Sequence, residues 1–229
     1  MPSSSSLWLL LALLQPRASL SGRSYPLFKQ CDAAWATDEM GVAGAGERST
    51  ICGEGCAMTS LAMVLSGVGV RVGALAANPQ SLNGWLEAHD GYRCLSGDCN
   101  NLVLDAVSRL NASVQLVGEA AKPPLAQLRA GLDAGELAYL AHIPALTHFV
   151  LLTGYGEGEV LTVNDAFYNA TSYVYGNISD ILIYNISAVP ARSGGGLRED
   201  VSQRGVQLAV VSPHASATAA AGLPGLLSR

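Results

Sequence analysis

The stretch that decides the fold runs from Ile51 to Leu65 and reads ICGEGCAMTSLAMVL. Two cysteines, Cys52 and Cys56, stand four positions apart with glycines between them, and a long apolar run follows. Apolar residues would occupy nearly every side of a helix over Cys56 to Leu65, so the pattern predicts a buried helix rather than an amphipathic one. The glycines favour a sharp turn into that helix.

The position of Cys56 at the predicted helix start suggests a reactive thiol. The first N–H groups of a helix lack intrahelical partners, and together with the helix dipole they stabilise an anion. A thiol placed there ionises more easily than a free cysteine. A buried small side chain or one half of a disulfide would fit a lone cysteine equally well, so further residues are needed to decide.

The pattern changes from helical to extended along the chain. After the first helix, helices are expected in PQSLNGWLEAHDGY, NNLVLDAVSRL and PPLAQLRAGLDAG. Short runs rich in β-branched and aliphatic residues then predict strands in ELAYLAHI, THFVLLTGY, EVLTVND and TSYVYGNISDILIYNI. Helices first and strands later predict an α+β fold with an antiparallel sheet.

Two of these strands carry residues that could activate a thiol. His148 opens the run HFVLLTGY, and Asp165 ends the next strand across a glycine-rich turn. A hairpin brings cross-strand neighbours within about 5 Å, so we expect the two side chains to meet. Asn164 would face the opposite side of the sheet, and His142, on the preceding strand, is the alternative base.

Composition excludes one class of partner. The chain of 229 residues has a net charge of −5 and 14% charged residues. It contains no run of lysine and arginine, so no nucleic-acid partner is expected.

The two ends of the chain are set apart from the expected domain. Residues 1–22 hold a short apolar block followed by small residues, which predicts a cleavable signal peptide and no stable membrane insertion after its removal. Residues 23–189 form the expected domain. Residues 190–229, rich in glycine, alanine and serine, are expected to form a flexible tail.

Glycosylation sequons support export to an oxidising compartment, either outside the cell or in the secretory pathway. They begin at Asn111, Asn169, Asn177 and Asn185, where roughly one would be expected by chance.

The cysteine count leaves one thiol over. The chain has five cysteines, Cys31, Cys52, Cys56, Cys94 and Cys99. The short separation of the last two favours a local disulfide. A pair between Cys31 and Cys52 is the simplest choice among the rest, which leaves Cys56 free.

Metal and cofactor motifs are not evident. Cys94, Cys99 and His89 lack the second closely spaced ligand pair of a zinc site. No phosphate loop or dinucleotide fingerprint is present, so we expect neither metal nor cofactor. The oligomeric state is not predicted by the sequence.

Taken in order, the segments KQCDAAWA, TICGEGCAMTSLAMVL, NPQSLNGWLEAHDGY, HFVLLTGY and VLTVNDAFYN resemble the peptidase family 39-like domain. This is a branch of the papain-like cysteine peptidases, related to bacteriocin-processing leader peptidases. The resemblance covers roughly residues 25–188. It implies a papain-like fold, in which a buried N-terminal helix carries the nucleophile and packs on the antiparallel sheet.

The resemblance also implies roles for individual residues. Cys56 would be the nucleophile, His148 the base, Asp165 its orienting partner, and Gln30 an oxyanion donor together with the Cys56 backbone N–H. Gln30 precedes Cys56 by 26 positions, farther than in the leader peptidases, so the intervening loop would have to fold back. The expected activity is that of a thiol hydrolase acting on a peptide or protein substrate, with amidase or acyl-transfer chemistry also compatible. A glycosylated binding module without turnover is the alternative.

Overall fold

The computed structural model describes residues 23–46 and 48–188. The expected signal peptide and tail lie outside these residues. The helices are α1 (Ile51–Glu54), α2 (Cys56–Gly67), α3 (Pro79–Ala88), α4 (Ala106–Leu110) and α5 (Leu125–Ala134). Two short 3-10 helices follow, η2 (Pro144–Leu146) and η3 (Tyr175–Asn177).

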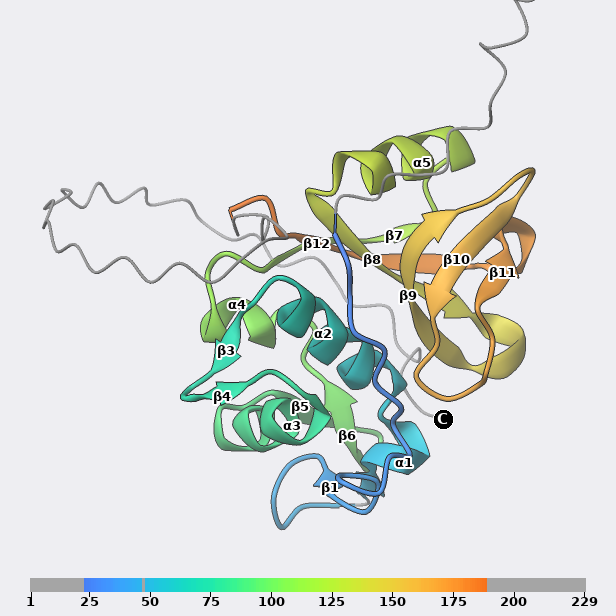
Figure 1. The fold of residues 1–229 in the computed structure, drawn as a ribbon. Coiled ribbons are helices and arrows are strands. Elements are labelled where there is room, and N and C mark those ends of the chain that lie inside the picture. The colour runs from blue at the N-terminus through green and yellow to red at the C-terminus, as the bar shows by residue number, and fades with distance from the viewer. Residues whose placement is uncertain (1–22, 47, 189–229) are drawn as a thin grey trace, which may run out of the picture.

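A six-stranded antiparallel sheet organises the molecule, in the order β11-β10-β9-β8-β12-β7 (Figure 1). Its strands are β7 (Gln115–Ala121), β8 (Leu137–Ile143), β9 (His148–Tyr155), β10 (Val160–Asn164), β11 (Ser172–Val174) and β12 (Asp180–Asn185). The expected α+β class with an antiparallel sheet is confirmed.

Three small hairpins complete the fold, at the edges of the helical half. They pair β1 (Glu39–Met40) with β2 (Ser49–Thr50), β3 (Arg71–Val72) with β4 (Leu75–Ala76), and β5 (Tyr92–Leu95) with β6 (Asp98–Leu102). The last hairpin corrects one expectation. The segment NNLVLDAVSRL is not a single helix, because its first three residues belong to β6 and only α4 is helical.

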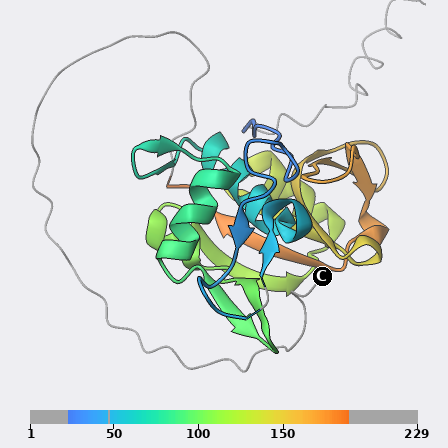
Figure 2. The ribbon, with the colours of Figure 1, turned by 90° about the horizontal axis from the view of Figure 1, so that it is seen from below.

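Helices cover both faces of the sheet. Leu140 and Leu151 belong to the core formed with α2, whereas their neighbours Ala141 and Val150 pack with Leu128 of α5 on the other face. Figure 1 shows α2 and α5 on opposite sides of the sheet, and Figure 2 shows α3 beside α2. Side chains alternate between the faces of a strand, so strands buried on both faces read as nearly continuous apolar runs.

Helix α2 is buried as its sequence predicted. Its residues from Ala57 to Leu65 are all buried, and it packs against β8 and β9 at the centre of the sheet. The helix therefore fixes the position of Cys56, its first residue, against the strand that begins with His148.

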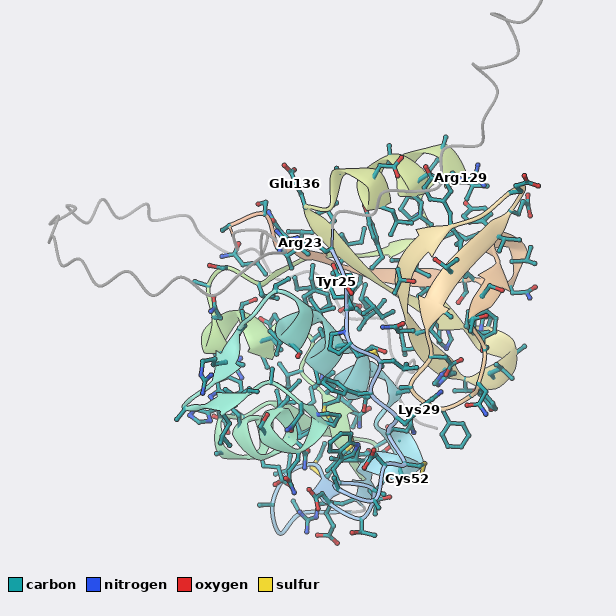
Figure 3. The ribbon with its side chains drawn as sticks, in the orientation of Figure 1. Arg23, Tyr25, Lys29, Cys52, Arg129 and Glu136 are labelled. Carbon is teal, nitrogen blue, oxygen red and sulfur yellow. A yellow bond between two sulfur atoms is a disulfide. The ribbon has the colours of Figure 1, made fainter. Side chains whose placement is uncertain are left out.

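The segment from Arg23 to Gln30 ties the helical half to the sheet (Figure 3). Arg23 donates a hydrogen bond of 2.8 Å to the backbone carbonyl that follows α5. At the other end, the Gln30 N–H donates to the Ala166 carbonyl at 2.8 Å. The segment thus runs along the molecule and ends beside the loop that carries Asp165.

Candidate active site

Cys56 is the free cysteine of the described residues, and it begins α2 behind a glycine turn. Gly55 caps the helix, and a Cβ there would lie 2.4 Å from the Ile51 carbonyl oxygen. No side chain fits at that distance, so the turn from α1 into α2 requires glycine. The thiol consequently stands at the N-terminus of a twelve-residue helix, beside backbone N–H groups that lack intrahelical acceptors.

His148 and Asp165 form a buried pair. The His148 Nε2 lies 2.8 Å from the Asp165 Oδ1, and both residues are almost fully buried. Asn164 instead points away and donates to the Tyr25 carbonyl. Because Nε2 is held by the carboxylate, Nδ1 is the nitrogen left for a partner on the other side of the ring. Cys56 acts on the same ring, since its side chain is among the groups that raise the pKa of His148.

The Asp165 carboxylate is fixed by several donors. Its Oδ1 accepts the backbone N–H groups of Phe167 and Tyr168, each at 2.9 Å, and its Oδ2 accepts the Tyr173 hydroxyl at 2.7 Å. Burial alone would raise the pKa of Asp165, but the hydrogen bonds with His148, Tyr173 and Phe167 lower it. The carboxylate therefore stays ionised and holds the imidazole in one orientation.

The electrostatic surroundings favour a charged imidazole. Burial by itself would lower the pKa of His148, but hydrogen bonds to Asp165 and Cys56 and the charges of both raise the pKa to about 9. At neutral pH the ring is then protonated. An imidazolium beside the thiol is the arrangement in which a cysteine acts as a thiolate nucleophile.

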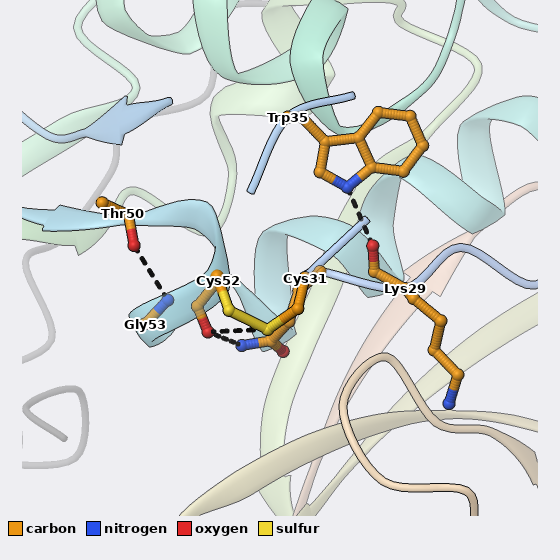
Figure 4. The surroundings of a disulfide bond; sticks show 7 residues. Lys29, Cys31, Trp35, Thr50, Cys52 and Gly53 are labelled. Carbon is orange, nitrogen blue, oxygen red and sulfur yellow. Dashed lines mark hydrogen bonds between the residues drawn. A yellow bond between two sulfur atoms is a disulfide. The ribbon is translucent and has the colours of Figure 1, made fainter. Parts of the chain in front are cut away.

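Gln30 reaches the same site from the N-terminal segment. Its side chain is 2% exposed, and its Nε2 donates to the Cys52 carbonyl at 2.7 Å. An amide nitrogen carries two N–H groups, so one is engaged at Cys52. The intervening loop folds back, as a contact between Gln30 and this region requires. The Cys31–Cys52 disulfide closes the loop (Figure 4). The second disulfide joins Cys94 to Cys99. Both pairs are those that the sequence favoured.

An open cleft of about 310 Å³ passes over these groups. Its walls come from the N-terminal segment, from α1 and the start of α2, from the loop before β9 with the first residue of β9, and from the loop after β10. The lining residues are Gln30, Gly53, Glu54, Cys56, Leu146, Thr147, His148, Phe167 and Tyr168. The candidate nucleophile, base and oxyanion donor thus face one space.

The remaining histidines are placed elsewhere. His142 lies on β8, where its Nδ1 bonds the Ser179 hydroxyl at 2.9 Å. Burial lowers the pKa of His142, so its ring is neutral. The exposed His89 stacks on Trp85, and His214 lies outside the described residues. Of the histidines that the structure describes, His148 is the one paired with a buried carboxylate.

Other predicted features fall on the surface or yield no site. Asn169 and Asn177 are exposed, and Asn111 and Asn185 are half-buried.

Within residues 23–46 and 48–188 there is no group of three histidine, cysteine or acidic side chains arranged to hold a metal ion. The same residues include no helix with the length and apolar character needed to cross a membrane.

Several residues around the site were not predicted from the sequence. Glu54 and Thr147 line the cleft, and Tyr173 binds the Asp165 carboxylate from β11. Thr147 has a φ of 48°, in the left-handed region, directly before His148. A non-glycine residue in that region is uncommon, but nothing in the local sequence signals it.

Comparisons of the chain with known protein families, with curated proteins and with solved structures found no match.

Proposed function

We propose that this protein is a papain-like thiol hydrolase, a cysteine peptidase of the family 39-like type. The observation that carries the proposal is the buried hydrogen bond of 2.8 Å between His148 and Asp165, on a ring that also interacts with the free Cys56. A nucleophile, a base and a group that orients the base are the three parts that thiol catalysis needs.

In the proposed reaction the Cys56 thiolate attacks the carbonyl carbon of a peptide bond. The carbon–nitrogen bond then breaks as the His148 imidazolium donates its proton to the leaving nitrogen, and an acyl group remains on the sulfur. His148, now neutral, takes a proton from water. The resulting hydroxide attacks the thioester, which releases the acid and restores the thiolate.

The negative oxygen that forms in both steps needs donors. The N–H of Cys56 belongs to the first turn of α2, where backbone N–H groups have no intrahelical acceptor. The second N–H of Gln30 is the other donor, because the first is engaged by the Cys52 carbonyl. The Gln30 side chain lines the cleft beside Cys56, which supports this role.

An extracellular or secretory-lumen location belongs to the same proposal. The two disulfides are compatible with a secreted protein, because such bonds persist in oxidising compartments. A free cysteine that escapes pairing there has a chemical reason to remain free.

Labelling of the thiol tests the proposal. Wild-type protein should react with iodoacetamide at Cys56, and peptidyl ketones that mimic an acyl substrate should label the same residue. Cys56→Ala should abolish both reactions, and His148→Ala should slow them. Hydrolysis of a peptide library, followed by mass spectrometry, should disappear with either variant. Labelling that persists in Cys56→Ala, or a wild-type protein that binds peptides without cleaving any, contradicts the proposal; the second result favours a binding module.

A further inference from the structure

A second, smaller cavity opens beside the nucleophile. It has a volume of about 50 Å³, room for about three or four water molecules. Glu54, Cys56 and Thr147 line both this inner cavity and the cleft. A substrate whose carbonyl carbon lies at the Cys56 sulfur could therefore place a short side chain in the inner cavity.

One residue of the inner-cavity wall, Asn100, has an acceptor without a partner among the residues that the structure describes. Asn100 is 6% exposed and donates from Nδ2 to the Glu54 carboxylate. That bond fixes the amide orientation, because a carboxylate accepts and cannot donate. The Asn100 Oδ1 is then the free end of the amide, and within the described residues it is buried without a hydrogen-bond partner. Such a group is costly to leave unpaired.

The charge of the cavity is negative. Glu54 contributes a carboxylate, and His142, which also lines the cavity, is neutral because burial lowers its pKa. The remaining walls are largely apolar and include Met40, Met58 and Phe149. Apolar walls suit the methylene part of a side chain, whereas the acceptor and the carboxylate suit a donor at its tip.

We propose that the inner cavity is a specificity pocket that selects a substrate residue next to the scissile bond with a short side chain ending in an N–H or O–H donor, an amine above all. The inference rests on the proposed function, since it concerns the substrate of the same site. The donor would pair with the Asn100 Oδ1, and an ammonium group would also neutralise the Glu54 carboxylate.

Three nearly isosteric side chains test the pocket. Peptidyl acyloxymethyl ketones would carry norvaline, homoserine or 2,4-diaminobutyrate at the residue that bears the reactive carbonyl carbon. These side chains end in a methyl, a hydroxyl and an ammonium group. The rate of Cys56 labelling should rise in that order, by about tenfold for the ammonium over the methyl group, and an aspartate probe should be slowest. Each rate is divided by the iodoacetamide rate of the same variant.

Two variants separate the contributions of Glu54 and Asn100. Glu54→Gln keeps an acceptor for the Asn100 amide but removes the charge, so the diaminobutyrate and homoserine probes should label Cys56 at equal rates. Asn100→Leu removes the acceptor, so the homoserine probe should label Cys56 no faster than the norvaline probe. Glu87→Gln is the matched control, because Glu87 is a half-buried carboxylate that lines neither cavity. If Asn100→Leu does not fold, the Glu54→Gln comparison decides.

Two results distinguish failure of the inference from failure of the proposed function. If Cys56 is labelled but norvaline reacts as fast as diaminobutyrate, or the order is the same in Glu54→Gln as in the wild type, the pocket inference is wrong and the proposed function stands. If neither iodoacetamide nor any ketone labels Cys56, the proposed function is wrong and the inference fails with it.

Discussion

The imidazole of His148 is held by a hydrogen bond at Nε2, and its Nδ1 is left for a reacting partner. Asp165 holds its Nε2 at 2.8 Å, and the carboxylate is itself fixed by Tyr173 and two backbone N–H groups. A base held in this way has one orientation and one tautomer. The side chain on the other side of the ring therefore decides with which group the imidazole can exchange a proton. In this protein Cys56 acts on the ring.

Substitution of Asp165 by asparagine tests this clamp. The carboxylate raises the pKa of His148, so Asp165→Asn should move that pKa downward from about 9 in the wild type. The ring would then be less protonated at neutral pH, and turnover should fall by about 10²- to 10⁴-fold. NMR titration of the His148 ring protons in the two proteins measures the pKa. An unchanged His148 titration would refute the role given to Asp165.

As a proposed oxyanion donor, Gln30 should make a separable contribution to the rate. Loss of one oxyanion donor typically lowers kcat by about 10²- to 10³-fold, so Gln30→Ala should lower kcat with little change in KM. Its bond to the Cys52 carbonyl should add a loss of about 1 kcal/mol in the free energy of unfolding. Gln80→Ala is the control, since Gln80 is an exposed glutamine that binds Asp38. A rise in KM with unchanged kcat would assign Gln30 to substrate binding.

Some contacts between these residues could be predicted from the sequence, and others could not. His148 and Asp165 lie on consecutive strands, so hairpin geometry predicts their meeting. Asn100 and Glu54 come from separate elements, β6 and α1, and no motif connects them. Their contact depends on the tertiary packing of the β5–β6 hairpin beside α1, which no local pattern in the sequence encodes.

At the scale of elements, the Cys31–Cys52 disulfide joins the N-terminal segment to α1. Gln30 precedes one end of this bond, and Cys56 lies four residues beyond the other. Thr50 caps α1 through Gly53, and the Trp35 ring N–H donates to the Lys29 carbonyl at 2.8 Å (Figure 4). The disulfide thus holds together the two segments that the proposed oxyanion donors come from.

Removal of each disulfide should have a different effect. In the chain-entropy model, losing Cys31–Cys52, with a sequence separation of 21, costs about 3 kcal/mol, and losing Cys94–Cys99, with a separation of 5, costs about 2 kcal/mol. The double serine variant at 31 and 52 should also slow ketone labelling of Cys56, because Gln30 loses its anchor. Denaturant unfolding and labelling rates measure both effects. Equal labelling rates in the two double variants would contradict the anchoring role.

The elements that escaped prediction lack a local signal. Strand β7, QLVGEAA, contains glycine, alanine and glutamate, which are uncommon in strands. It exists because it pairs with β12 at the edge of the sheet. In β6, the pairing of Leu102 with Tyr92 across the disulfide-closed hairpin overrides the helical pattern of NNLVLDAVSRL. Helix α2 and strands β8 and β9 were predictable because burial on both sides leaves long apolar runs.

At the scale of the whole molecule, the protonation of His148 should make the free energy of unfolding depend on pH. Its pKa is about 9 in the folded protein and about 6.5 when unfolded. A raised folded pKa gives stability that is fully present below about pH 6.5 and is lost as the pH rises through about 9. The free energy of unfolding, measured by denaturant between those values, should therefore decrease with pH.

His148→Gln provides the control for this measurement. Glutamine does not titrate in this range, so the variant should show a flatter dependence of its unfolding free energy on pH. Parallel curves for the two proteins would show that other groups set the slope.

The proposed catalytic groups come from distant parts of the chain, and this has a consequence for biosynthesis. A ribosome that adds about 5–20 residues each second needs about 5–20 s to make the 109 residues from Cys56 to Asp165. All five cysteines, at positions 31, 52, 56, 94 and 99, are translated before His148, the proposed base. A wrong bond to Cys56 would consume the proposed nucleophile, so the nascent chain has to form the correct disulfides before the candidate active site is assembled.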